Sequence, residues 1–125
     1  MKFFAWKKLK SSFQHAFQGL CDVFWEQQAF RIQIIISLFV LFLIFGIPLS
    51  SVERAVLFLT IFFTLSMEIL NSIFEKTVDA FEPAINAKVK KIKDMMAGAS
   101  LLLAIGCIII GVLIFWPYAR NLLGV

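Results

Sequence analysis

Residues 55–82 read AVLFLTIFFTLSMEILNSIFEKTVDAFE and change character within one helical pattern. The first part, through Met67, is nearly all apolar, whereas acidic and amide side chains recur from Glu68 onward. An apolar run of roughly 20 residues is long enough to cross the hydrocarbon of a membrane. The stretch therefore predicts a membrane-spanning helix that becomes polar before it ends.

The rest of the chain is similarly apolar. Of its 125 residues, 61% are hydrophobic and only 16% are charged, whereas globular domains average about 45–50% apolar residues. We expect spans at residues 30–49, 55–75 and 97–116, with a connection at 76–96 between the last two. The sequence thus predicts a single domain and an all-α membrane protein.

An amphipathic helix is predicted before the first span, within residues 1–29. Its apolar side chains recur at three- or four-residue steps, and glutamine and aspartate occupy other positions around the helix. This pattern is typical of a helix that lies in the headgroup region of a membrane. Packing of the same face on the protein's own spans is an equally open alternative. The apolar positions are Phe13, Ala16, Phe17, Leu20 and Phe24.

Basic residues are unevenly distributed between the two sides of the expected spans. Ten of the twelve lysines and arginines lie before or at the start of the first span, or between the second and third, and only Arg54 and Arg120 lie elsewhere. The positive-inside rule then places the amino terminus and the 76–96 connection in the cytoplasm, and the carboxyl terminus outside. The ten are Lys2, Lys7, Lys8, Lys10, Arg31, Lys76, Lys88, Lys90, Lys91 and Lys93.

Glu68 is a candidate for chemistry because of its expected depth. Counted from Ala55, it lies roughly 20 Å along the helix axis and therefore within the cytoplasmic leaflet. A charge in hydrocarbon costs a few kcal/mol, so such a residue is a functional candidate by default. A carboxylate among apolar groups also takes up a proton more readily than one in water, which suits a general base.

A polar stripe continues from Glu68 along the same helix. At about 100° per residue, Ser72, Glu75 and Asp79 fall within about 40° of Glu68, and Asn71 within about 60°. Asn71 and Glu75 are oxygen ligands of the kind that Mg²⁺ prefers when it keeps waters and is shared with phosphates. The plain alternative is that the stripe only hydrogen-bonds neighbouring helices or pairs with lysines.

Two longer motifs, MEILNSIFEKTVDAFEP at 67–83 and AKVKKIKDMMAGASLLLAI at 87–105, resemble the prokaryotic diacylglycerol kinase family. They carry the spacing E-x-x-N-x-x-x-E-x-x-x-D, followed by Lys-Asp before a helix rich in small residues. SFQHAFQGL and AFRIQ match the amino-terminal half of the family, so the resemblance covers nearly the whole chain. FRIQ and GVLIFWP are closer to its undecaprenol kinase branch.

The resemblance implies ATP-dependent phosphorylation of a membrane lipid alcohol, undecaprenol or diacylglycerol, with Mg²⁺ as cofactor. It further implies a homotrimer with active sites between subunits, in the inner membrane of a prokaryote. Glu68 takes the position of the catalytic base. Asn71 and Glu75 take the metal and ATP-phosphate positions, and Lys93 and Asp94 those of the nucleotide contacts. No nucleic acid partner is expected.

Gln27, Asn86 and His15 also correspond to positions of the family's site, and Lys8 is a further candidate. Gln27 stands where the family has a metal-binding carboxylate, with Glu26 one residue away, and the sequence leaves open which of the two contacts the metal. Asn86 replaces a histidine near the nucleotide and retains the ability to hydrogen-bond. His15 would stack on adenine or is a polar residue at the membrane interface. Lys8 would reach phosphate or bind anionic lipid.

Small residues recur at three- and four-residue steps in the third span, which predicts close packing of helix backbones. They are Ala97, Ser100, Ala104, Cys107 and Gly111. The chain has no G-x-x-x-x-G-K-[ST] motif, so a P-loop is excluded. A rival function of another class is a non-enzymatic membrane scaffold or channel subunit, in which the polar stripe joins helices.

Overall fold

The computed structural model describes residues 3–81 and 86–125, which contain four α-helices and no strand. The expected all-α fold is confirmed. Lys2, counted above among the basic residues, and residues 82–85 of the expected connection lie outside the described residues. The helices are α1 (Trp6–Glu26), α2 (Gln28–Gly46), α3 (Ser51–Phe81) and α4 (Ala87–Leu123).

Three of these helices are long and apolar enough to cross a membrane, over Gln28–Gly46, Ser51–Ala80 and Ala87–Leu123. Many of their phenylalanine, leucine and isoleucine side chains are exposed, as with Phe42 on α2 and Leu113 on α4. Hydrocarbon accepts such side chains, and a helix satisfies its own backbone hydrogen bonds there. The chain is a multi-pass membrane protein.

Both α3 and α4 extend beyond the spans expected at 55–75 and 97–116. Residues 76–81 and 87–96, which the sequence had assigned to the connection, are helical. Hydropathy marks where a helix leaves the hydrocarbon, whereas the backbone hydrogen bonds continue through residues that favour helix, such as lysine and methionine. The basic residues that precede the third apolar run therefore stand on a helix.

Local contacts set the first residues of α3. Pro48 restricts the residue before it to extended backbone, and Ile47 has φ −110° and ψ 140°. Ser50 and Glu53 then form a capping box: the Ser50 N–H donates to Glu53 Oε2 at 2.9 Å, and the Glu53 N–H donates to Ser50 Oγ at 3.2 Å. Tyr118 of α4 donates from its hydroxyl to the same Glu53 Oε2 at 2.7 Å, which joins α3 to α4.

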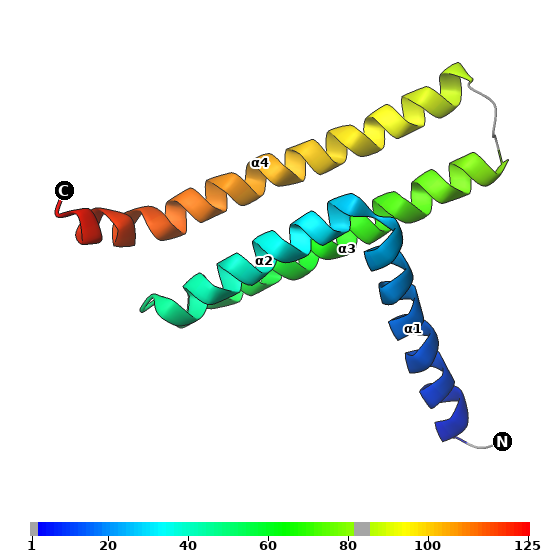
Figure 1. Ribbon diagram of the computed structural model, residues 1–125, viewed down its shortest axis with the longest axis horizontal. Coiled ribbons are helices and arrows are strands. Elements are labelled where there is room, and N and C mark those ends of the chain that lie inside the picture. The colour runs from blue at the N-terminus through cyan, green and yellow to red at the C-terminus, as the bar shows by residue number, and fades with distance from the viewer. Residues whose placement is uncertain (1–2, 82–85) are drawn as a thin grey trace.

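The packed core lies toward one end of the helix bundle. α2 and α3 run side by side in opposite directions, and α4 returns along α3 (Figure 1). The buried cluster consists of Ile44, Leu49, Leu57 and Ile61, around the connection that contains Pro48. We call this the Pro48 end. The opposite end, called here the basic end, is formed by the first turn of α2, the last turns of α3 and the first turns of α4.

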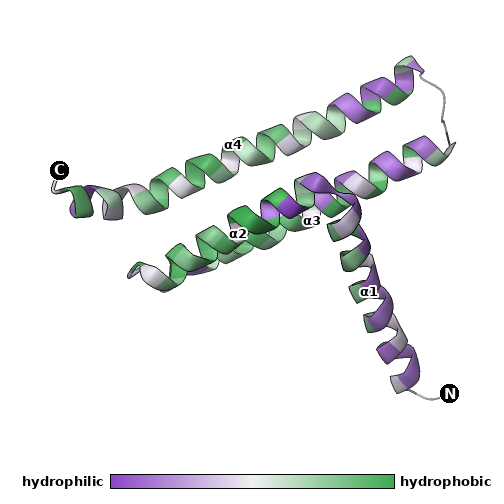
Figure 2. Ribbon diagram, in the orientation of Figure 1, coloured by the Kyte–Doolittle hydropathy of each residue, from purple (hydrophilic) through white to green (hydrophobic). Residues whose placement is uncertain are grey.

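Figure 2 shows that hydrophilic residues gather at the basic end of α3 and α4, whereas the remainder of α2 to α4 is mostly hydrophobic. α1 leaves the bundle at a steep angle from the start of α2 (Figure 1). None of its residues is buried, and Phe13, Phe17 and Leu20 are exposed. An exposed apolar face on a helix that stands away from the bundle fits the membrane-surface interpretation.

Candidate active site

Glu68 is buried between α2 and α3, with 8% of its surface exposed. Its Oε2 accepts a hydrogen bond of 3.1 Å from Gln33 Nε2 of α2. Its backbone carbonyl accepts one of 2.9 Å from the buried Ser72 hydroxyl. A buried carboxylate is costly unless a donor faces it, and Gln33 is that donor. Among the described residues, Glu68 is the one buried ionisable side chain.

The polar stripe passes from buried to exposed surroundings along α3. Asn71 is half-buried, and Glu75 and Asp79 are exposed. The stripe from Glu68 to Asp79 covers roughly 16 Å of helix. One end of it is therefore buried within the protein, and the other end is accessible to a water-soluble molecule.

Lys93 brings α4 to the exposed end of the stripe. Its Nζ lies 2.6 Å from Asp79 Oδ1, and the two side chains are 42% and 60% exposed. Pairs of this exposure contribute about 0–1 kcal/mol to stability, so the contact is easily exchanged for another anion. Asp94, the next residue, is exposed. The structure thus brings Lys93 to the same end of α3 as Glu75.

Asn86 caps the amino terminus of α4. Its Oδ1 accepts a hydrogen bond of 2.8 Å from the Lys88 N–H, which is one of the donors that the first turn of a helix leaves without a partner. The side-chain oxygen of Asn86 therefore already has a hydrogen-bond partner in the first turn of α4. The amino terminus of a helix and a nearby lysine both favour phosphate, and both are present at this point of the chain.

The junction of α1 and α2 contains Gln27 and Glu26, the two candidates for the second metal contact. Gln27 adopts extended backbone between the two helices and is half-buried. Glu26 forms an ion pair with Lys76 of α3, the residue after Glu75. Arg31 donates to the carbonyls of Phe24 and Trp25 at 2.9 and 2.8 Å and so caps α1. The Glu26 carboxylate therefore lies beside the last turns of α3.

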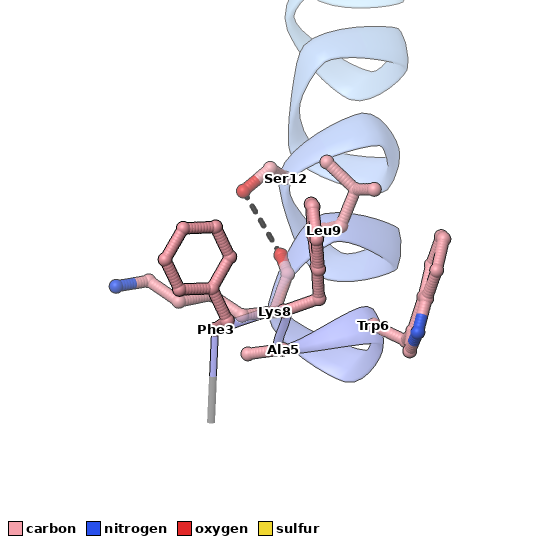
Figure 3. A pocket seen from close by; sticks show the side chains of 7 residues that line it. Phe3, Ala5, Trp6, Lys8, Leu9 and Ser12 are labelled. Atoms are coloured by element: carbon pink, nitrogen blue, oxygen red, sulfur yellow. Dashed lines mark hydrogen bonds between the residues drawn. The ribbon is translucent and has the colours of Figure 1, made fainter. Parts of the chain in front are cut away.

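Lys8 and His15 are exposed on α1 and are not brought to the stripe in this chain. They lie roughly 27 and 16 Å from the end of α1, measured along its axis. Lys8 lines an open hollow at the start of α1 with Phe3, Trp6 and Leu9 (Figure 3). Ser12 Oγ donates to the Lys8 carbonyl at 2.9 Å.

Oxygen ligands for a metal are present at the basic end, but not as a complete protein site. Within residues 3–81 and 86–125, no three histidine, cysteine or carboxylate groups are placed to hold an ion together. Mg²⁺ typically binds one or two carboxylates and fills its other positions with waters and substrate phosphates. Glu75, Asn71 and the nearby Glu26 have the right chemistry for that partial shell.

Gln33 is the residue of this site that the sequence reasoning did not single out. It is a polar side chain inside the apolar run RIQIIISLF, at residues 31–39, and polar residues within a span are functional candidates. That signal was available. The pairing of Gln33 with Glu68 could not be predicted, because Glu68 lies on another helix and the spacing within one helix does not reveal the register between two helices.

The matched family is described as prokaryotic diacylglycerol kinase, and its model covers residues 14–115. The match includes Gln33, Glu68, Asn71, Glu75 and Lys93, and excludes Lys8. It spans most of the chain, so this protein belongs to the prokaryotic diacylglycerol kinase family and is a lipid kinase. The non-enzymatic alternative is thereby set aside.

Individual relatives bear names of the same class. The undecaprenol kinase of Bacillus subtilis is 35% identical over 106 residues, covering 85% of this chain and 86% of its own. A diacylglycerol kinase of Helicobacter pylori is 32% identical over 112 residues, covering 90% and 80% of the two chains. A diacylglycerol kinase of Synechocystis is 32% identical over 123 residues, covering 95% and 70%.

Proposed function

We propose that this chain transfers the γ-phosphoryl group of ATP, with Mg²⁺, to the hydroxyl of a membrane lipid alcohol. The names of its relatives make undecaprenol and diacylglycerol the two candidate acceptors. The observation that carries the proposal is the polar stripe of α3, which joins a buried carboxylate to exposed acidic and basic groups and half-buried amides at the basic end. A lipid hydroxyl and a nucleotide phosphate can then meet along a single helix.

Glu68 acts on the lipid alcohol in this proposal. It accepts the proton of the hydroxyl as the oxygen attacks phosphorus, and Gln33 Nε2 holds one carboxylate oxygen so that the other faces the acceptor. The burial of Glu68 limits the access of water, a competing acceptor, to the carboxylate. General-base catalysis of this type contributes about 10²- to 10⁴-fold.

Groups at the basic end hold the nucleotide. Glu75 and Asn71, with Glu26 or Gln27, would bind Mg²⁺, which when bound neutralises charge on the phosphates. Lys93 exchanges Asp79 for a phosphate oxygen, and Asp94 and Asn86 provide further polar contacts. In phosphoryl transfer, positioning and charge neutralisation supply most of the catalysis.

His15 and Lys8 stand away from the stripe of their own chain, so their proposed contacts with adenine and phosphate require a neighbouring subunit. We propose a homotrimer in which α1 of one chain reaches the stripe of the next. We also propose that the protein lies in the inner membrane with its amino terminus in the cytoplasm. The concentration of lysine at the basic end supports this orientation.

The test uses purified protein in detergent and follows labelled γ-phosphate from ATP into undecaprenol and into diacylglycerol. Glu68→Gln keeps the shape of the side chain but cannot accept the proton, so kcat should fall by about 10²-fold or more while ATP binding persists. Glu53→Gln, the same change at the Pro48 end, is the control and should retain activity. An unchanged rate in Glu68→Gln, or no labelled lipid with either alcohol, would contradict the proposal.

A further inference from the structure

A cavity of about 480 Å³ lies between α2, α3 and α4, on the Pro48 side of Glu68. Its walls come from all three helices and include Val40, Leu57, Ile61, Ile108 and Phe115. No lysine, arginine or carboxylate lines it. The cavity is therefore unsuited to a phosphate and suited to hydrocarbon, and its size falls within the range of about 300–1,000 Å³ typical of ligand sites.

Most polar atoms in the walls already have partners. Thr60 Oγ1 donates to the Val56 carbonyl at 2.8 Å, and Thr64 Oγ1 donates to the Thr60 carbonyl at 2.7 Å. Such bonds back to the same helix leave a wall that is apolar in effect. Gln33 differs, because its Oε1 is buried and has no hydrogen-bond partner in the described chain. A buried acceptor without a donor costs about 1–3 kcal/mol, so this atom indicates a missing donor.

The unpartnered oxygen stands where the cavity meets the proposed base. Gln33 lines the cavity and donates through Nε2 to Glu68. Thr64, another lining residue, is one helical turn before Glu68 on α3. The cavity thus begins at the Glu68–Gln33 pair and extends away from the basic end. A hydrocarbon chain that ends in a hydroxyl fits both the apolar walls of the cavity and the unpartnered oxygen of Gln33.

We propose that this cavity binds the hydrocarbon segment next to the hydroxyl of the lipid alcohol. The hydroxyl donates to Gln33 Oε1 when the lipid binds, and it turns to the Glu68 carboxylate oxygen that Gln33 does not hold when its proton is transferred. The assignment rests on the proposed function and places the lipid-binding site within one chain. It also gives the small residues of α4 a different role from the close helix packing that their spacing predicted. Ala104, Cys107 and Gly111 line the cavity, and a Cβ added at Gly111 would meet no atom within 4 Å.

The open space at Gly111 permits a sharp test. Gly111→Leu extends a side chain into the cavity without a backbone clash. The KM for the lipid alcohol should rise about tenfold, equivalent to lost contact with roughly two methylene groups. The KM for ATP should not change. Gly106→Leu is the matched control, because Gly106 lies on the same helix, has equally open surroundings and does not line the cavity.

Binding of tritiated undecaprenol and of tritiated diacylglycerol without ATP, together with native mass spectrometry, separates the possible results. Weaker binding of at least one lipid in Gly111→Leu, but not in Gly106→Leu, supports the proposal. Wild-type affinity for both lipids in Gly111→Leu overturns it, and so does a changed oligomeric state, which would assign the cavity to a second copy of the chain. Failure of the wild type to phosphorylate any lipid would overturn the proposed function, while the binding measurement would still decide the role of the cavity.

Discussion

Lys93 and Asp79 form an exposed pair that links α4 to α3 at the basic end. Two interpretations of Lys93 predict different effects of replacing Asp79. If Lys93 serves to hold the two helices together, its removal and the removal of Asp79 are equivalent. If Lys93 binds a phosphate of ATP, Asp79 is only its partner while the nucleotide is absent. The two residues can therefore be separated by mutation.

We expect Lys93→Met to lower ATP affinity by about 10- to 150-fold, the loss of one hydrogen bond to a charged group. Asp79→Asn should change ATP affinity much less, and its effect on unfolding should stay within about 1 kcal/mol because the pair is exposed. Isothermal titration with a non-hydrolysable ATP analogue measures the affinities. Equal losses in the two variants would show that the pair, and not a phosphate contact, explains the lysine.

At the scale of helices, the start of α3 is fixed more firmly than its other end. The capping box satisfies backbone donors at Ser50 and Glu53, and the Tyr118 hydroxyl ties the same carboxylate to α4. At the basic end, the described links between α3 and α4 include the exposed Lys93–Asp79 pair. The two helices are therefore held together at the Pro48 end and are less constrained where the nucleotide is proposed to bind.

Tyr118→Phe tests this difference. It removes the hydrogen bond to Glu53 while the capping box remains, so the free energy of unfolding should fall by about 1.5–3 kcal/mol, as for hydrogen bonds to charged groups. The KM for ATP should remain as in the wild type. Denaturant unfolding in detergent micelles measures the first quantity and steady-state kinetics the second. A large effect on ATP binding with wild-type stability would contradict this assignment.

For the whole molecule, the features that depend on a single segment of the chain could be predicted from the sequence. Apolar runs predicted the three spans, and helical spacing predicted the α3 stripe. Contacts between segments were not predictable, because Gln33 and Glu68 are 35 residues apart and their pairing depends on how α2 packs on α3. Helix bounds beyond the apolar runs were not predicted, since hydropathy does not report where a polar helix ends.

The orientation of the molecule in the membrane can be tested with its own cysteines. Cys21 is exposed on α1, and Cys107 is half-buried among apolar residues of α4. With the amino terminus in the cytoplasm, a membrane-impermeant maleimide should label Cys21 in inverted vesicles and not in right-side-out vesicles. Leu122→Cys, at an exposed position near the carboxyl terminus, should show the reverse. Labelling of Cys21 only in right-side-out vesicles would invert the proposed topology.

Leu57 and Ile61 belong both to the buried cluster and to the wall of the proposed lipid cavity. Glu75, Lys93 and Asp94, by contrast, are exposed and do not belong to that cluster. Attempts to re-engineer the acceptor preference will consequently tend to weaken the fold, and compensating stabilisation will be needed. Changes at these proposed nucleotide contacts carry no such penalty, so the preference for the phosphate donor is expected to be the easier property to alter.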